Sequence, residues 1–285
     1  MIITVTGSHG LVGSALIPAL EAAGHTVRRL SLRGQPVNPA VLEHVDAIVH
    51  LAGEPIAVER WTPLQKSKIR DSRVEGTRAL CDAVARTETP PKVLVCASAI
   101  GYYGDRGEER LREESAPGAG FLSEVGVAWE AAAEPARRKG LRVVSLRFGI
   151  ILARQGGALA KILTPFRLGL GGRLGSGKQW FSWVTLEDVV GAIQFALATE
   201  SLCGPVNVVA PQPVTNAEFT QVLGRVLQRP VALPVPAFAL RLLLGEMADA
   251  LLLASTRVEP AALIAAGYRF RHPELEPALR ALLGQ

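Results

Sequence analysis

The sequence predicts an α/β fold: a Rossmann-type doubly wound parallel sheet with a smaller, mostly helical C-terminal lobe. Three observations support this class. Short apolar runs rich in β-branched residues alternate with helical patterns through the first half, a glycine-rich turn directly follows the first run, and after about residue 150 the alternation gives way to proline-punctuated helical segments. Strands that alternate with helices imply βαβ units, whose right-handed crossovers cover both faces of a parallel sheet.

Six apolar runs are expected to be the strands of this sheet. They lie at residues 2–6, 27–32, 46–51, 93–97, 143–146 and 206–209. Apolar residues at helical spacing predict helices at 11–23, 63–87 and 125–139. Thr185 is typical of the residue that caps a helix running to about residue 198, and Thr215 with Glu218 forms a capping box for another.

The chain is expected to form two parts. Residues 1–163 are predicted to form the dinucleotide-binding domain, with a sheet completed by later segments such as 184–210, and residues 164–285 the C-terminal lobe that contacts substrate. An apolar content of 48% is ordinary for a folded protein. The first residues have the character of a strand, not of a signal peptide, and no apolar run reaches about 18 residues. We therefore expect a cytoplasmic monomer or homodimer with no membrane span.

The formal charge of +5 raises the question of a nucleic-acid partner. The arginines are scattered along the chain, however, and the tight group of Arg28, Arg29 and Arg33 lies next to a nucleotide motif that can account for it. No nucleic-acid partner is expected. The three cysteines are odd in number and far apart, and the five histidines show no ligand spacing, so no metal site is predicted either.

The glycine-rich turn at residues 7–13, Gly-Ser-His-Gly-Leu-Val-Gly, joins the first strand to the first helix. Glycines in this context allow a sharp turn, a close approach of the backbone to a diphosphate, and tight packing of the helix on the sheet. The helix N-terminus then offers N–H groups to the phosphates. The residues expected to hold the diphosphate are Gly7, Ser8, Gly10, Leu11, Val12 and Gly13. The alternative is a tight turn without a ligand.

The end of the second strand indicates which nucleotide is bound. NAD sites usually place an acidic residue there, which binds the ribose hydroxyl. This chain instead has Ser31 and Arg33 with no acid in reach, and a serine and an arginine can hold a 2′-phosphate. NADP(H) is therefore favoured over NAD(H), unless Arg33 is only a solvated loop residue. Small residues in the tripeptide Leu51, Ala52 and Gly53, which ends the third strand, would let the cofactor approach the backbone.

Segments along nearly the whole chain resemble one protein family. They include the glycine turn, His50 to Glu54, Ser72-Arg73, Ser98 to Gly104, Trp129-Glu130, Arg147 to Gly149, Pro165 to Gly172, Trp183, Asn216 to Phe219, Gly245 to Ala248, and Gly267-Tyr268. The chain resembles an atypical extended short-chain dehydrogenase/reductase, of the NAD(P)-dependent epimerase/dehydratase-like branch called "epimerase family protein". The resemblance implies that Ser31, Arg33, Leu51, Ala52, Lys68, Arg73 and the backbone near Gly149 line the NADP site.

One departure from the resembled family concerns catalysis. Its members normally use a Tyr-x-x-x-Lys pair, in which the lysine lowers the pKa of the tyrosine. Leu122 and Gly126 stand in those places here, and no such pair occurs elsewhere. The candidate substitutes follow the fourth strand: Ser98 could hydrogen-bond a substrate oxygen and Tyr102 could act as an acid. Alternatively, Ser98 satisfies other polar groups, and Tyr102 and its neighbour Tyr103 only pack between the two parts.

Two functions therefore remain open. The first is an NADP-dependent oxidoreductase or epimerase that acts on a small polar, sugar-like substrate with non-standard acid/base residues. Its pocket would use Ser98, Tyr102, Trp180 and Trp183. The second is an NADP(H)-binding sensor or regulatory protein with little or no turnover. The missing Tyr-Lys pair favours the second, whereas the intact pocket-building segments favour the first, which we prefer.

Overall fold

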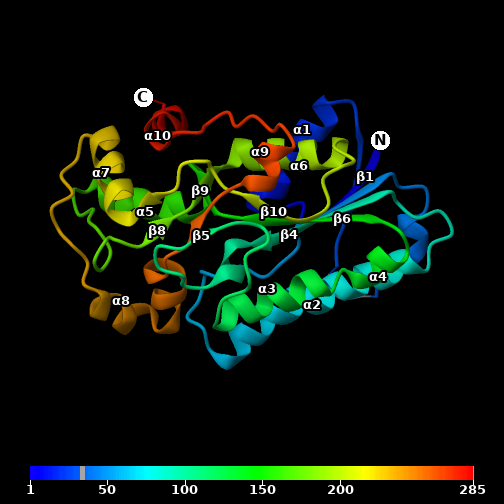
Figure 1. Ribbon diagram of the computed structural model, residues 1–285, viewed down its shortest axis with the longest axis horizontal. Coiled ribbons are helices and arrows are strands. Elements are labelled where there is room, and N and C mark those ends of the chain that lie inside the picture. Colours follow the sequence, from blue (N-terminus) through cyan, green and yellow to red (C-terminus); the bar gives the residue numbers. More distant parts are fainter. Residues whose placement is uncertain (33–35, 285) are drawn as a thin grey trace.

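The computed structural model describes residues 1–32 and 36–284, and its centre is a parallel sheet of six strands in the order β10-β6-β4-β3-β1-β2 (Figure 1). The strands are β1 (Ile2–Thr6), β2 (Thr26–Leu30), β3 (Ala47–His50), β4 (Val93–Ala99), β6 (Arg142–Phe148) and β10 (Gly204–Val208). Each coincides with a run predicted from the sequence, so the predicted fold class is confirmed. Because all six strands run the same way, their carboxyl ends share one edge, where ligands bind in such folds.

Helices cover both faces of the sheet (Figure 1). On one face lie α1 (Leu11–Ala22) and α6 (Leu186–Ala198), which pack Leu16, Ile17 and Ile193 against strand residues such as Val5 and Val95. On the other face lie α2 (Pro63–Ala85), α3 (Phe121–Ala131) and α4 (Glu134–Arg138). There α2 and α4 pack on a separate core. This two-sided burial explains why the strands are nearly continuous apolar runs.

Threonine caps fix where several helices begin. The hydroxyl oxygens of Thr62 and Thr185 accept the backbone N–H groups three residues on, and Thr215 forms the predicted reciprocal capping box with Glu218. The single helix predicted over 125–139 is instead two. It begins earlier, at Phe121, and is interrupted before Pro135, whose ring nitrogen has no hydrogen to donate to the helix.

The later part of the chain is largely helical, as predicted. It contains α5 (Gly157–Arg167), α7 (Asn216–Leu227), α8 (Ala237–Leu244), α9 (Ala261–Ala265) and α10 (Leu275–Leu283). Of these, α5, α7 and α10 share a third core. Between them lie short strand pairs: β5 (Arg110–Leu111) with β12 (Arg257–Val258), β7 (Ile150–Ala153) with β9 (Trp183–Thr185), and β8 (Trp180–Phe181) with β11 (Val214–Thr215). Leu263 and Tyr268, near the C-terminal end of the chain, pack in the same core as α6. The domain boundary near residue 163 stays a prediction. Within residues 1–32 and 36–284, no helix is both long and apolar enough to span a membrane.

Candidate cofactor and active site

Two glycines of the turn after β1 occupy positions that no side chain could share. Gly7 has a φ of 69°, and a Cβ there would lie 2.6 Å from the carbonyl carbon of Leu51 at the end of β3. A Cβ on Gly13 would lie 2.3 Å from the carbonyl oxygen of Gly7. The N–H of Gly10 donates to that same oxygen at 3.0 Å. The glycines therefore let β1, the turn and α1 pack against one another and against β3.

The N-terminus of α1 carries no side-chain cap and can bind an anion. The helix begins at Leu11, its N-cap Gly10 has no side chain to accept a hydrogen bond, and its first turn contains no acidic residue. His9 and Gly10 are exposed, whereas Ser8 is buried. The first N–H groups of a helix have no partner within the helix, and the helix dipole adds partial positive charge there. This end of α1 can hold a diphosphate, as the sequence predicts.

Hydrogen bonds to buried side chains fix the backbone at the end of β3. The backbone N–H groups of Leu51 and Ala52 both donate to Thr6 Oγ1, at 3.2 and 3.3 Å. Thr6 Oγ1 also lies 2.6 Å from His50 Nδ1, and His50 Nε2 lies 2.9 Å from Thr77 Oγ1. A hydroxyl oxygen has two lone pairs, so Thr6 gives its own proton to Nδ1 and His50 donates through Nε2. This chain fixes the backbone of Leu51 and Ala52 beside the glycine turn.

His50 itself is fully buried, and burial lowers its pKa to about 4. It is therefore neutral at physiological pH and acts as a hydrogen-bonding bridge between β1 and α2. Thr77 accepts a further hydrogen bond from Trp129 Nε1 at 3.0 Å, which extends the network to α3. His50 is predictable from the sequence only as part of the family-like segment His50 to Glu54, although its place directly before the Leu-Ala-Gly tripeptide is a usable signal.

Arg73 is held on α2 beneath the end of β3. Its Nη1 donates to the carbonyl oxygens of Glu54 and Ile69, at 2.9 and 3.1 Å, and its guanidinium lies 5.0 Å from the centre of the Trp129 ring. Burial lowers the pKa of Arg73 to about 10. A Cβ on Gly53 would lie 3.3 Å from the guanidinium carbon of Arg73. Gly53 and Arg73 are therefore close enough to line the same site, as the resemblance implies.

Of the remaining predicted cofactor residues, those that the structure describes lie along the same carboxyl edge or on α2. Ser31 directly follows β2 and is exposed, Lys68 is exposed on α2, and Arg33 falls outside the described residues. Gly149 directly follows β6, and a Cβ there would lie 2.6 Å from the carbonyl oxygen of Ser182. Close packing against Ser182 is therefore enough to explain why residue 149 is a glycine. A role of Gly149 in cofactor binding stays a prediction.

Ser98 is part of a buried ionic cluster. Its hydroxyl donates to Glu130 Oε1 at 2.7 Å, and Ser98 is only 2% exposed. The two oxygens of Glu130 each accept a hydrogen bond from Arg147, from Nε and Nη2, both at 2.8 Å. The Arg147 side chain is 3% exposed. In the sequence, Glu130 and Arg147 stand out only as family-like positions. The adjacency of β4 and β6, which places Ser98 opposite Arg147, is what joins them.

The two tyrosines after β4 have different surroundings. The hydroxyl of Tyr103 is buried, donates towards Arg112 O and Asn207 Oδ1, and accepts from Arg147 Nη1. Burial raises the pKa of Tyr103 to about 12. Tyr102 is half-buried, its ring lies 3.6 Å from the Arg147 guanidinium, and its hydroxyl makes no hydrogen bond within the described part of the chain. Tyr103 is thus a structural residue, whereas Tyr102 keeps an available hydroxyl.

The two tryptophans predicted for a substrate pocket do not share one. Trp183 is fully buried in the core around α5 and α7, and its Nε1 donates to the carbonyl oxygen of Gln212, so the prediction that it lines a pocket is wrong. Trp180 is half-buried, and its Nε1 donates to Glu108 Oε2 at 2.7 Å. The sequence of a glycine-rich segment does not indicate on which side of a strand an aromatic side chain lies.

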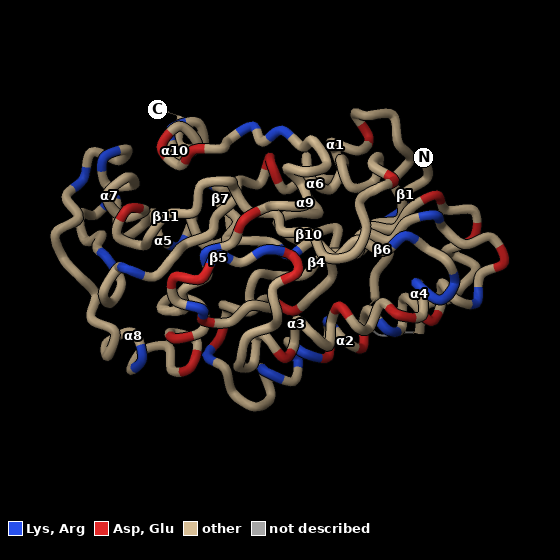
Figure 2. The backbone as a smooth tube through the Cα atoms, in the orientation of Figure 1, with Lys and Arg blue, Asp and Glu red and all other residues tan. Residues whose placement is uncertain are grey.

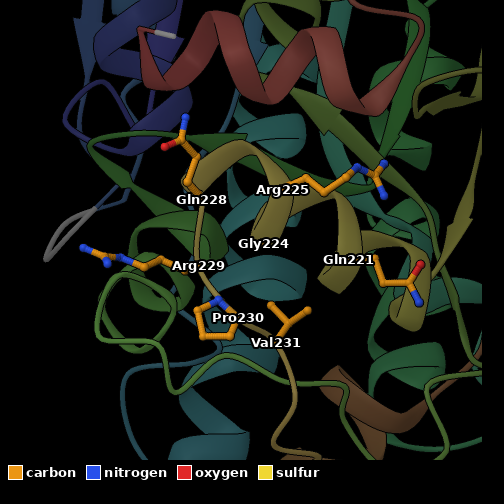
Figure 3. A pocket seen from close by; sticks show the side chains of 7 residues that line it. All are labelled: Gln221, Gly224, Arg225, Gln228, Arg229, Pro230 and Val231. Carbon is orange, nitrogen blue, oxygen red and sulfur yellow. The ribbon is translucent and has the colours of Figure 1, made fainter.

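A hollow of about 520 Å³ lies elsewhere, at the end of α7 (Figure 3). Arg225 and Arg229 line it, but their side chains point to opposite sides, and Arg225 is paired with Glu276 at 3.0 Å. None of the predicted site residues lines this hollow. In the described ranges, no cluster of three or more His, Cys, Asp or Glu side chains is placed to hold a metal ion.

Comparisons with known proteins bear on this site. A family model described as "NAD dependent epimerase/dehydratase family" matches residues 3–209, and one described as "Domain of unknown function (DUF1731)" matches residues 235–282. An "Epimerase family protein" of Mycobacterium tuberculosis (strain CDC 1551 / Oshkosh) is 44% identical over 292 residues, which cover 98% of this chain and 96% of the relative.

Two solved structures are also similar. The crystal structure of human epimerase family protein SDR39U1 with NADPH has a TM-score of 0.92 at 34% identity and covers all of both chains. The structure of a nucleoside-diphosphate sugar epimerase from Corynebacterium glutamicum has a TM-score of 0.82 at 36% identity, and covers all of this chain and 58% of that one. These matches confirm the resemblance found in the sequence and the predicted class of cofactor. The chain belongs to the NAD-dependent epimerase/dehydratase family.

Proposed function

We propose that this protein binds NADP(H) at the carboxyl edge of its sheet and acts as an oxidoreductase or epimerase on a small polar, sugar-like substrate. The observation that carries the proposal is the uncapped N-terminus of α1, which Gly7 and Gly13 hold against β3 with no acidic side chain in its first turn. The diphosphate would lie on the backbone of Gly7, Ser8, Gly10, Leu11, Val12 and Gly13. When bound, NADP(H) would supply a hydride acceptor or donor.

The preference for NADP(H) rests on the residues that follow β2. Ser31 offers a hydroxyl, Arg33 a guanidinium, and neither position carries an acid that would repel a 2′-phosphate. The human relative that was crystallised with NADPH supports the same choice. Arg28 and Arg29, both exposed on β2, add positive charge near this end of the site. Leu51, Ala52, Gly53, Lys68 and Arg73 would line the rest of the cofactor cleft.

For the chemistry, we propose Ser98 and Tyr102. The Ser98 proton is directed to Glu130, so the lone pairs of its oxygen are left to accept a hydrogen bond from a substrate hydroxyl. Tyr102, with its hydroxyl unengaged within the described residues and its ring on Arg147, would exchange a proton with the substrate oxygen. Arg147 and Glu130 would position both residues without touching the substrate.

A second candidate function is an NADP(H)-binding sensor with little or no turnover. The observation that favours it is the near-complete burial of Ser98, which fits a structural role as the third member of the Glu130–Arg147 cluster. Under this alternative, cofactor binding is unchanged, but Ser98 and Tyr102 serve the fold.

Calorimetric titration tests the binding proposal. NADPH should bind more tightly than NADH by at least roughly tenfold, the equivalent of about 1.4 kcal/mol. Arg33→Ala should remove most of that preference, whereas Arg269→Ala, at an exposed arginine beyond α9, should keep it. Saturation with neither nucleotide would overturn the proposal, and an unchanged preference in Arg33→Ala would overturn the role of Arg33.

Turnover separates the two candidate functions. Oxidation of bound NADPH is followed across a panel of carbonyl compounds, including keto-sugars. The enzyme proposal expects activity that falls in Ser98→Ala and Tyr102→Phe, with NADPH affinity retained. Tight NADPH binding with no oxidation on any compound would favour the sensor. An activity that survives both substitutions would show that other residues carry the proton.

A further inference from the structure

A hollow of about 440 Å³ lies beside the last strand of the sheet and away from the cofactor cleft. It is walled by β5, β12, α9 and the segment after β10. Strand β10 lies four strand intervals from β1, which leads into the glycine turn, so about 19 Å separates the two strands. Three arginines and one glutamate line this hollow, together with prolines, alanines and Ile264. We refer to it as the arginine hollow.

Two arginines of the lining lie side by side on neighbouring strands. Arg110 of β5 and Arg257 of β12 are direct partners in the parallel strand pair, and both line the hollow, so their side chains share one face. Like charges directly opposite each other on neighbouring strands destabilise a sheet. Arg112, which directly follows β5, adds a third guanidinium to the same lining. Figure 2 shows blue and red segments of the chain gathered around β5.

A single carboxylate on this lining offsets part of that charge. Glu259 pairs with Arg110 at 3.3 Å and with Arg112 at 2.9 Å. Arg257 lies on the ring of Trp180, with its guanidinium 4.0 Å from the ring centre. Three guanidinium groups against one carboxylate leave two net positive charges on the lining.

Two further acids, Glu113 and Glu114, attract the charge of Arg112 from outside the lining. Glu113 is turned to the backbone N–H groups of Asn207 and Ala262, and Glu108 accepts from Trp180. Glu114 follows in the sequence but is not part of the lining. The other wall is apolar, and Ile264 is 54% exposed there. The hollow thus combines a doubly cationic side with an apolar side.

We propose that the arginine hollow binds the phosphate monoester group of a small molecule whose apolar part lies against Ile264. A phosphate monoester carries a charge of about −1.5 to −2 at pH 7, which suits a lining whose arginines outnumber its carboxylate by two, whereas a carboxylate ligand carries only one charge. Guanidinium groups also bind phosphate oxygens in a bidentate manner. The volume lies within the range of small-molecule sites. The ligand is separate from the cofactor, so this site does not depend on the proposed function.

Phenyl phosphate is a suitable probe, because it carries a phosphate dianion on an apolar ring. The full-length protein is titrated calorimetrically with phenyl phosphate and, at equal ionic strength, with benzoate. Each titration is run with and without saturating NADPH. Saturable binding of phenyl phosphate is expected in both conditions, with benzoate weaker by roughly tenfold or more.

Three matched substitutions locate the binding. Arg257→Gln should weaken phenyl phosphate binding by roughly tenfold, and Glu259→Gln, which leaves a third positive charge uncompensated, should strengthen it several-fold. Arg269→Gln, at an exposed arginine outside the hollow, should match the parent. Opposite shifts in the two hollow variants cannot arise from simple loss of folding.

Four results would overturn the proposal. They are no saturation by phenyl phosphate in the millimolar range, equal affinity for benzoate, unchanged binding in Arg257→Gln, and loss of phenyl phosphate binding when NADPH is present. The last would place the probe in the cofactor cleft, and it would leave the NADP(H) proposal intact.

Discussion

The side chain of Tyr102 lies against Gly126 of α3, where a Cβ on residue 126 would come within 3.3 Å of the Tyr102 Cβ. Gly126 is the position at which the resembled dehydrogenases have their catalytic lysine. A side chain at residue 126 would therefore crowd Tyr102 from its first carbon onwards.

Gly126→Lys should consequently destabilise the fold. Forcing a long, charged side chain into this packed contact should cost about 3 kcal/mol or more, measured by urea unfolding. Tyr102→Ala in the same chain should restore part of that stability, because it removes the ring, whose Cδ2 would lie 3.6 Å from the new Cβ, although the nearer Cα and Cβ remain. If the two substitutions were simply additive, Tyr102 and Gly126 would not compete for one volume.

Gly13→Ala should disrupt the glycine turn. The added methyl group would lie 2.3 Å from the carbonyl oxygen of Gly7, which belongs to the backbone and cannot rotate away. We therefore expect the free energy of unfolding to fall by about 2 kcal/mol and NADPH binding to be lost. The matched control is Gly76→Ala on α2, where the nearest atom would be 4.0 Å away. That change should stabilise the helix by about 0.5–1 kcal/mol. Equal effects at both positions would contradict the packing argument.

Glu130→Gln should break the buried ionic cluster. Arg147 would keep its charge at 3% exposure without a carboxylate partner, and removing one member of a buried pair typically costs about 3–5 kcal/mol. Glu134→Gln on the neighbouring helix is the control, because its pair with Arg138 is exposed and should contribute below about 1 kcal/mol. Urea unfolding of both variants measures the difference. A cost for Glu130→Gln no greater than for Glu134→Gln would show that the cluster does not stabilise the fold.

The six strands of the central sheet and most helices could be predicted from the sequence, because burial on two faces produces continuous apolar runs and threonine caps mark helix starts; the short strand pairs of the later part could not. Helix α5 was missed. Its buried residues Leu159, Leu163 and Phe166 have helical spacing, but the glycines before it and Pro165 within it obscure the pattern.

The cofactor turn was predictable for a local reason, since its glycines, strand and helix are contiguous in the chain. The cluster of Ser98, Glu130 and Arg147 was not. It depends on β4 and β6 being neighbours in register and on α3 crossing them, relationships between segments that no local pattern contains. Ser98 was selected correctly as a residue of the carboxyl edge, but its partners emerge only from the tertiary structure.

The stability of the fold should fall in mild acid because of His50. Burial lowers its pKa to about 4 in the folded protein, against about 6.5 in an unfolded chain. Between these values the unfolded chain binds the proton and the folded protein does not, so the free energy of unfolding decreases as the pH falls through this window. Above pH 6.5 this contribution is complete, and at pH 5 the loss from His50 amounts to about 2 kcal/mol.

Urea unfolding of the cofactor-free protein between pH 7.5 and 5 measures this dependence. His50→Gln should be less stable at neutral pH, because it alters the hydrogen bonds to Thr6 and Thr77, but its stability should vary less with pH than that of the parent. His25→Gln, at a partly exposed histidine outside this network, should retain the parent's slope. Identical slopes for His50→Gln and the parent would rule out His50 as the titrating group.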